Sequence, residues 1–218
     1  MNREEARVIY EEAKTRDDLT VEAKKYYKAW QIEEYRGYSP GEGLVPVFLE
    51  SYNPTGTCID YGCGPGRAGK ALYEAGLDVL MFDFAPNALD EAVEESLNDR
   101  LRFEQVDLTQ PIELVDGEDL WQSEWGYCCD VCEHLPESQI DAALDNILKS
   151  SKSVFFQIST LPETWGEHPA VQEKLHMNVQ NYWYWLVKFA DHKGVVRRSN
   201  RFYGLSIYMV SRDDGYNC

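Results

Sequence analysis

The chain has 218 residues, 44% of them hydrophobic and 27% charged, which is the composition of one globular domain with an added segment. Its formal net charge of −17 disfavours nucleic acid as a partner, because such a field repels phosphate backbones. No apolar run reaches the roughly 18 residues of a membrane span, and residues 1–14 lack the apolar core of a secretory signal, so we expect a cytoplasmic protein with no membrane association.

The first part of the chain has a helical pattern. Apolar residues recur at helical spacing among the charges of residues 2–36, which predicts two amphipathic helices. Residues 37–43 contain Pro40 and three glycines and are typical of a loop, and a further helix is expected over 44–52. We therefore expect residues 1–52 to form an N-terminal helical cap and residues 53–218 to form the main domain.

From Thr57 onward, short apolar runs alternate with helical stretches. This alternation predicts βαβ units in a parallel sheet with right-handed crossovers. The last two strands are joined by a short turn at Gly204, so they should run antiparallel. The expected strands are 57–61, 78–82, 102–106, 125–131, 153–158, 195–202 and 205–210, and the expected helices are 67–75, 87–97, 137–149 and 178–192.

The six cysteines lack the spacing of a disulfide framework. Cys128 and Cys129 are adjacent in an apolar run, so we expect reduced thiols. Cys129 and Cys132 form a CxxC pair, but no second Cys or His pair follows at zinc-finger spacing, which disfavours structural zinc.

An apolar strand runs directly into a glycine-rich turn within residues 58–67. The turn contains Gly62, Gly64 and Gly66, and glycine lets the backbone approach a ligand where a Cβ would collide. The helix that follows offers N–H groups at its N-terminus. By itself, this pattern fits either a ligand-binding loop or a plain strand-to-helix connection.

Carboxylates stand at the ends of the next strands. Asp83 lies about twenty residues past the glycines, where a carboxylate can accept both hydroxyls of an adenosine ribose. Asp107 follows the third strand, where an acceptor could meet the adenine amino group, and Asp130 ends the fourth. The carboxyl ends of parallel strands gather at one crevice, so the series favours a nucleoside site, although each carboxylate could instead cap a helix.

These ordered motifs resemble class I S-adenosylmethionine-dependent methyltransferases, closely over residues 56–160 and loosely elsewhere. The resemblance rests on Asp60-Tyr61-Gly62-Cys63-Gly64-Pro65-Gly66 and on Asp83. It implies a Rossmann-like three-layer α/β sandwich with a seven-stranded, mostly parallel sheet and an antiparallel C-terminal strand. It also implies S-adenosylmethionine as the cofactor.

The resemblance further implies which residues contact this cofactor. Asp60 and Gly62 to Gly66 would line its methionine part, and Asp83 its ribose. Asp107 with Leu108 would line the adenine, and Asp130 with Val131 would face the transferable methyl. The expected cofactor-binding residues are Asp60, Gly62, Cys63, Gly64, Gly66, Arg67, Asp83, Phe84, Asp107, Leu108, Asp130 and Val131.

Residues 130–136 resemble the D-V-x-E-H-L-P segment of many small-molecule methyltransferases. His134 could act there as a general base, because an imidazole exchanges protons near neutral pH, and Glu133 is a second catalytic candidate. Alternatively, Glu133 and His134 only open the next helix and orient the loop.

A metal-assisted alternative rests on the same residues. The spacing Asp130-x-x-Glu133-His134 is similar to the metal-binding segment of small-RNA 2'-O-methyltransferases and of some ubiquinone-pathway O-methyltransferases. A further ligand would come from His176 or His168. Many family members with this segment use no metal, so we expect none here.

The function favoured by the sequence is methyl transfer from S-adenosylmethionine to a hydroxyl, or an amine, of a small-molecule or glycan-like acceptor. Aromatic residues after the fifth strand, within 175–189, could wall the acceptor pocket or fill a helix core, and His176 is the third catalytic candidate. An NAD-binding oxidoreductase is one alternative, although its usual Gly-x-Gly-x-x-Gly is missing. A non-catalytic adenosyl-binding module is another.

Overall fold

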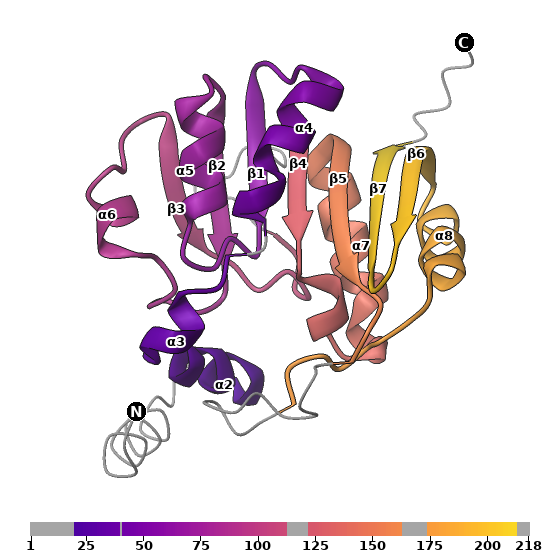
Figure 1. Ribbon diagram of the computed structural model, residues 1–218, viewed down its shortest axis with the longest axis horizontal. Helices are drawn as coiled ribbons and strands as arrows, with labels where there is room; N and C mark the ends of the chain where they lie inside the picture. The colour runs from indigo at the N-terminus through magenta and orange to yellow at the C-terminus, as the bar shows by residue number, and fades with distance from the viewer. Residues whose placement is uncertain (1–19, 40, 113–121, 163–173, 213–218) are drawn as a thin grey trace.

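A seven-stranded sheet forms the centre of the computed structural model, which describes residues 20–39, 41–112, 122–162 and 174–212 (Figure 1). The strand order is β3-β2-β1-β4-β5-β7-β6. The pairs among β1 to β5 are parallel, whereas β7 is antiparallel to both β5 and β6, which confirms the expected Rossmann-like arrangement. The strands are β1 (Thr57–Tyr61), β2 (Asp78–Asp83), β3 (Leu101–Gln105), β4 (Ser123–Cys129), β5 (Ser151–Ser159), β6 (Gly194–Phe202) and β7 (Leu205–Arg212).

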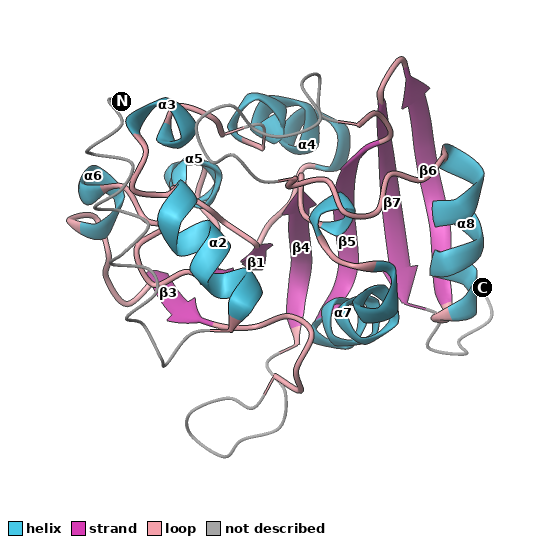
Figure 2. Ribbon diagram, turned by 90° about the horizontal axis from the view of Figure 1, so that it is seen from below, coloured by secondary structure: helices cyan, strands magenta, loops and turns pink. Residues whose placement is uncertain are grey.

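Helices cover both faces of the sheet and complete the three layers (Figure 2). Phe48 and Leu72 bring α4 and α5 into the core on one face, and Leu144 and Trp185 bring α7 and α8 into the core on the other. Burial of these apolar faces is the main force that holds the layers together. The helices are α2 (Val21–Ala29), α3 (Glu33–Arg36), α4 (Val45–Tyr52), α5 (Arg67–Glu74), α6 (Glu91–Glu94), α7 (Glu137–Ser150) and α8 (Tyr182–Asp191), with 3₁₀ turns η1 (Glu42–Leu44) and η2 (Cys132–His134).

Two expectations about the whole chain can be compared with these elements. Within the described ranges, no helix has the length and apolar character needed to cross a membrane. The cysteines in the same ranges are all buried and unpaired by disulfides, which agrees with reduced thiols.

The helix expected over residues 87–97 is much shorter than predicted. Only Glu91–Glu94 is helical. The carbonyl oxygens of residues 87–89 accept hydrogen bonds from the Arg36 side chain, so they face the N-terminal segment. These carbonyls are therefore satisfied without continuing a helix.

The helices α2 and α3 lie at the carboxyl ends of the parallel strands, apart from the helices that cover the sheet (Figure 1). Tyr26 of α2 and Trp30, which caps the C-terminus of α2, pack in an apolar cluster with Ala85, from the turn after β2. In contrast, α4 packs on the sheet itself through the fully buried Phe48. The division between a cap and a main domain after residue 52 stays a prediction, and this packing groups α4 with the sheet. We use "the cap" below for α2 and α3.

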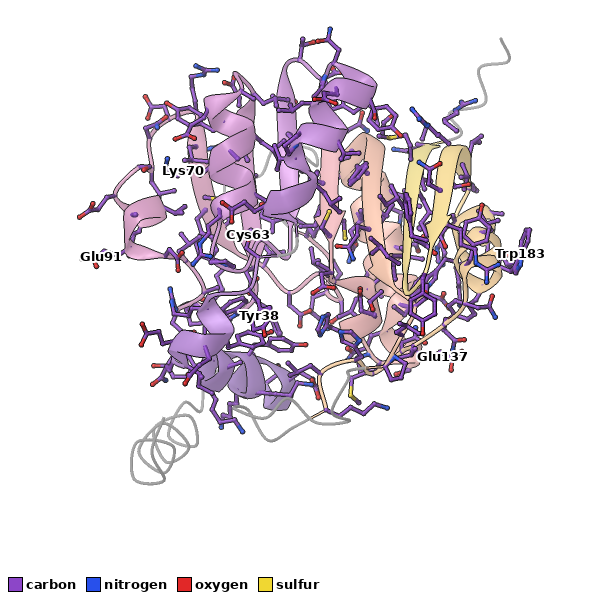
Figure 3. All side chains as sticks on the ribbon, in the orientation of Figure 1. Tyr38, Cys63, Lys70, Glu91, Glu137 and Trp183 are labelled. Atoms are coloured by element: carbon purple, nitrogen blue, oxygen red, sulfur yellow. The ribbon has the colours of Figure 1, made fainter. Side chains whose placement is uncertain are left out.

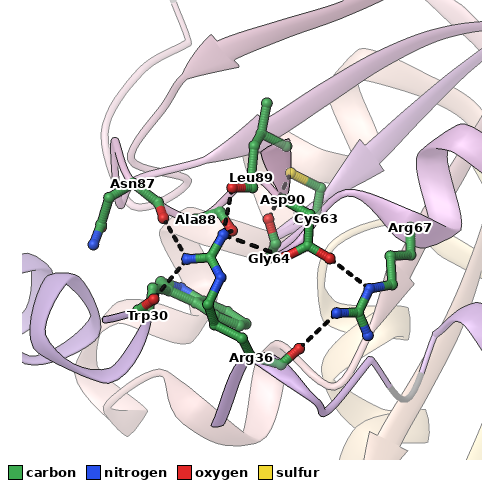
Figure 4. A network of polar contacts seen from close by, with 9 residues as sticks. All are labelled: Trp30, Arg36, Cys63, Gly64, Arg67, Asn87, Ala88, Leu89 and Asp90. Carbon is green, nitrogen blue, oxygen red and sulfur yellow. Dashed lines mark hydrogen bonds and ion pairs between the residues drawn. The ribbon is translucent and has the colours of Figure 1, made fainter. Parts of the chain in front are cut away.

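Arg36 is the main polar link between the cap and the sheet (Figure 4). Its guanidinium donates to the carbonyl oxygens of Trp30 at 2.6 Å and Asn87 at 3.0 Å, and lies 3.2 Å from the carboxylate of Asp90. Asp90 also accepts a hydrogen bond from Arg67 at 2.6 Å. A planar guanidinium with several fixed donors suits this role better than a lysine ammonium.

Candidate active site

The turn between β1 and α5 is built from glycines in the left-handed region of backbone space. Gly62, Gly64 and Gly66 have φ values of 66°, 52° and 76°. Side chains rarely adopt these angles, and a Cβ would also collide, since on Gly62 it would lie 2.5 Å from a methyl of Val131. The geometry of this turn therefore requires glycine, and the turn lies directly against the segment that follows β4.

The cap covers the same turn. A Cβ on Gly64 would lie 2.9 Å from the ring of Trp30. Cys63 is buried beside it, at the edge of the sheet that faces the cap (Figure 3). Burial raises the pKa of the Cys63 thiol well above its usual value, which makes this cysteine an inert part of the turn.

Asp60, at the end of β1, is a buried carboxylate with an open hydrogen-bonding position. It is 3% exposed, and its Oδ2 has no hydrogen-bond partner among the described residues. Burial raises the pKa of Asp60 to about 7, the backbone N–H of Gly69 opposes this rise, and the nearby charge of Asp83 adds to it. A buried acceptor without a partner is costly, so a donor group or cation at this position would stabilise it.

Asp83 lies at the end of the neighbouring strand β2 and shapes the glycine turn. Its Oδ2 accepts the N–H of Gly64 at 2.9 Å, and its Oδ1 accepts the N–H of Ala85 at 2.9 Å. Burial raises the pKa of Asp83 to about 6, although these hydrogen bonds lower it. Phe84, the next residue, packs against Tyr26 of the cap with ring centroids 5.2 Å apart.

Two residues expected to bind the cofactor have local structural partners. Asp107 Oδ1 accepts the N–H of Thr109 at 2.9 Å and its hydroxyl at 2.7 Å, so it closes a turn and does not cap a helix, which was the alternative expected from the sequence. The guanidinium of Arg67 binds Asp90 and the carbonyl oxygen of Arg36, within the network that holds the cap. Leu108, beside Asp107, is buried in the core.

Asp130 and His134 form a polar group just after β4. Asp130 has a left-handed backbone with φ of 60°, which is strained for a residue with a side chain. Its Oδ2 lies 3.7 Å from Nε2 of His134, and Nδ1 of His134 lies 2.8 Å from the hydroxyl oxygen of Tyr26. Burial favours the protonated form of Asp130, but the adjacent imidazole of His134 outweighs it and lowers the pKa of Asp130 to about 2.

Glu133 lies next to this group in the interior of the protein. It is fully buried, its carboxylate accepts the N–H of Ser159, and its carbonyl oxygen accepts the N–H of Asn178 at 2.9 Å. Burial raises the pKa of Glu133 well above its usual value, and the charge of Asp130 adds to the rise. The other carboxylate oxygen of Glu133, Oε2, is buried and has no hydrogen-bond partner among the described residues.

The contact with Asn178 brings His176 to the site. The rings of His176 and His134 lie edge to face with centroids 4.8 Å apart, and Nδ1 of His176 lies 3.0 Å from the carbonyl oxygen of Leu161. Asp130, His134 and His176 offer ligand atoms that lie within 4.8 Å of one another. His168, the other histidine considered as a metal ligand, lies outside the described residues.

Sequence reasoning missed Tyr26 and Trp30. Both belong to a helix whose pattern signals only an apolar face, and no motif marks either residue. Their contacts with His134 and Gly64 depend on how the cap docks on the sheet, which local sequence does not encode.

Comparison with known proteins gives one match to a family model. Residues 58–153 match a model described as a methyltransferase domain. The match includes the glycine turn and the segment after β4, and it agrees with the resemblance to class I S-adenosylmethionine-dependent methyltransferases. No curated protein matches the chain significantly.

Three solved structures share the methyltransferase fold. An O-methyltransferase family protein from Burkholderia thailandensis is 13% identical with a TM-score of 0.62, covering 81% of this chain and 57% of its own length. Magnesium protoporphyrin IX methyltransferase from Synechocystis, with bound S-adenosylhomocysteine, is 19% identical with a TM-score of 0.58, and the match covers 79% of this chain and 81% of that one. A 1,6-didemethyltoxoflavin-N1-methyltransferase from Burkholderia thailandensis is 14% identical with a TM-score of 0.61, covering 84% and 82%.

The family-model match and the shared fold favour a methyl donor over the NAD alternative. The residues also fit this donor on structural grounds. The open Oδ2 of Asp60 is a buried acceptor at the start of the glycine turn, suited to the ammonium of the donor's methionine part. Neutralisation of Asp60 by that ammonium would offset the penalty that raises its pKa.

Proposed function

We propose that the protein is a methyltransferase that transfers a methyl group from S-adenosylmethionine to a hydroxyl, or an amine, of a small-molecule acceptor. The observation that carries the proposal is the convergence of Asp60, Asp83 and Asp130 at the ends of the adjacent strands β1, β2 and β4. All three lie around one glycine turn, since Asp83 binds the N–H of Gly64 and Val131, next to Asp130, packs on Gly62. Ligands of open α/β sheets bind at such an edge.

Each carboxylate has a separate part in this proposal. Asp60 would hold the ammonium of the donor, and Asp83 would accept the ribose hydroxyls with lone pairs not used by Gly64 and Ala85. Asp107 would accept the adenine amino group through the oxygen that Thr109 does not occupy. The remaining expected residues, Phe84, Leu108, Cys63 and Arg67, would shape or support the walls.

The acceptor would bind at the end of β4. S-adenosylmethionine supplies a methyl group on a positively charged sulfur, so the chain's own task is to align a lone pair with it and to remove a proton. His134 is the proposed base, with the ionised Asp130 beside its Nε2 to stabilise the charged imidazole. The carbonyl oxygen of Glu133 accepts the N–H of Asn178, and this contact brings His176 to the same place.

Two observations support a small acceptor. The neighbouring toxoflavin-pathway and porphyrin enzymes are named for small aromatic molecules. The net charge of −17 opposes a nucleic acid chain, which also counts against an RNA 2'-O-methyltransferase. We propose an oxygen acceptor over nitrogen because a hydroxyl needs the base that His134 provides.

The proposal is tested by separating donor binding from turnover. Calorimetric titration with S-adenosylhomocysteine should show that Asp83→Ala abolishes binding, whereas His134→Ala binds normally. Transfer of a labelled methyl group to a panel of hydroxylated and amino-substituted aromatic compounds should be slower in His134→Ala. The opposite behaviour of the two variants would overturn the assigned roles.

Matched controls exist for both variants. Asp78→Ala removes a carboxylate from the other end of β2, where it is half exposed and pairs with Arg100. His192→Ala removes an imidazole that pairs with Asp141 and Asp145 on the outer layer. Both controls should keep donor binding and turnover.

A further inference from the structure

The contacts of His134 favour one position for the proton of its neutral ring. Nε2 lies 3.7 Å from the Asp130 carboxylate, which is beyond hydrogen-bond distance but places a negative charge on the Nε2 side of the ring. That charge favours a proton on Nε2, which leaves the lone pair on Nδ1. That lone pair points at the hydroxyl oxygen of Tyr26, 2.8 Å away, so Tyr26 donates its proton to Nδ1.

We propose that Tyr26 is a further catalytic residue, through which His134 removes the proton of the methyl acceptor. The acceptor hydroxyl would bind to the oxygen of Tyr26 in a chain that continues through His134 to Asp130. This inference rests on the proposed function, because it describes how the proposed base reaches its substrate. The arrangement follows the general logic of a reacting group, a base and a carboxylate that orients the base.

The proton transfers in this chain balance. As the acceptor oxygen forms its bond to the methyl carbon, the carbon–sulfur bond breaks and leaves its electron pair on sulfur. The acceptor's proton passes to the oxygen of Tyr26, while the proton of Tyr26 passes to Nδ1 of His134. The resulting imidazolium lies beside Asp130, whose negative charge stabilises it.

The surroundings of Tyr26 suit this role. Its side chain is 8% exposed and packs against the rings of Phe84 and His134, which fixes the direction of the hydroxyl. Burial raises the pKa of Tyr26 well above its usual value, and nearby carboxylates add to the rise, so the phenol retains the proton that it must donate. Asp83, one of those carboxylates, also shapes the glycine turn, which places Tyr26 near the donor.

The protonated nitrogen can be measured without any methyl acceptor. Long-range ¹H–¹⁵N NMR of ¹⁵N-histidine protein, with S-adenosylhomocysteine added, distinguishes the two neutral forms of each ring. We expect His134 to carry its proton on Nε2. His176 is an internal reference and should carry its proton on Nδ1, which faces the carbonyl oxygen of Leu161. Each signal is assigned by its loss in a His→Gln variant, and a proton on Nδ1 of His134 would overturn the proposal.

The kinetic test uses Tyr26→Phe, which keeps the ring contacts and removes only the hydroxyl. We expect turnover to fall about as far as in His134→Ala, on the order of 100-fold, with unchanged binding of S-adenosylhomocysteine. The double variant should be no slower than the slower single variant, because both changes interrupt one chain. The control Tyr52→Phe removes a tyrosine hydroxyl from α4, whose ring packs on Phe48 against the sheet, and should keep full turnover.

The outcomes separate this inference from the proposed function. Normal turnover of Tyr26→Phe together with slow turnover of His134→Ala would show that His134 acts without Tyr26. Multiplicative losses in the double variant would also overturn the shared chain. A wild-type protein that binds no S-adenosylhomocysteine would refute the proposed function, whereas the NMR result on His134 would stand.

Discussion

Replacing Asp60 with asparagine should stabilise the donor-free protein above neutral pH and weaken donor binding. Asp60 is 3% exposed, and burial raises its pKa from 3.8 to about 7. Asparagine keeps the shape of the side chain but has no charge to remove from water. The same substitution removes the charge that would hold the donor's ammonium.

The size of the effect follows from the linkage between protonation and folding. Between about pH 4 and pH 7 the folded protein keeps a proton on Asp60 that the unfolded chain has released. The stability due to this proton is fully present below the unfolded pKa and is lost as the pH rises through about 7. Each pH unit between the unfolded and the folded pKa corresponds to about 1.4 kcal/mol of unfolding free energy. From pH 4 to pH 8, the stability of Asp60→Asn relative to the wild type should therefore rise by at most about 4 kcal/mol.

Urea unfolding followed by the fluorescence of the six tryptophans measures this difference at a series of pH values. Asp78→Asn is the matched control, because Asp78 begins the neighbouring strand β2 with a side chain that is 46% exposed. The difference in unfolding free energy between Asp78→Asn and the wild type should not increase toward high pH. Titration with S-adenosylhomocysteine at pH 8 should show weaker binding by Asp60→Asn. A stability difference for Asp60→Asn that stays constant from pH 5 to pH 8 would refute the burial argument.

Three further changes test other parts of the site. Gly62→Ala should destabilise the protein by about 1–3 kcal/mol and impair donor binding, because its Cβ would collide with Val131 at a positive φ. Urea unfolding should show that a second change, Val131→Ala, restores part of the lost stability. Full stability of Gly62→Ala alone would contradict the described geometry of the turn. Arg36→Lys should lower the free energy of unfolding by about 2–3 kcal/mol, because an ammonium cannot donate to all the separate carbonyl groups that the guanidinium reaches. Equal urea midpoints for the variant and the wild type would argue that Arg36 does not hold the cap on the sheet. EDTA should leave turnover unchanged, because the donor is already activated and His134 is the proposed base. Loss of turnover with EDTA and its restoration by Mn²⁺ would support the metal-assisted alternative, for which Asp130, His134 and His176 offer ligand atoms within 4.8 Å of one another.

The strands were predictable because each is a short apolar run closed by a turn signal. Expected and observed bounds of the first strand agree at Thr57–Tyr61, and the others differ at their ends by a few residues. The Trp-rich helix expected over residues 178–192 begins later, at Tyr182, because the side chain of Asn181 caps its N-terminus. Its aromatic residues divide between core and surface, with Trp185 buried and Trp183 64% exposed on the outer side of α8 (Figure 3).

The site was predictable where a backbone conformation demands a particular residue. The glycines of the turn after β1 could be recognised because only glycine combines a positive φ with close contact to neighbouring segments. The partners of Asp107 and Arg67 could not, because a carboxylate after a strand serves a turn as readily as a ligand, and Arg67 meets Asp90 only in the folded chain. Their roles toward the donor stay predictions.

The cap connects the two halves of the proposed reaction. Tyr26 lies in α2, and Trp30, four residues later, is the C-cap of that helix with a helical backbone, so the two side chains share one face. Trp30 packs on the glycine turn at Gly64, while Tyr26 reaches His134 after β4. One docking event thus covers the proposed donor site and completes the proposed proton chain. Loosening the cap through Arg36→Lys should impair donor binding and turnover together, whereas Tyr26→Phe should lower turnover alone.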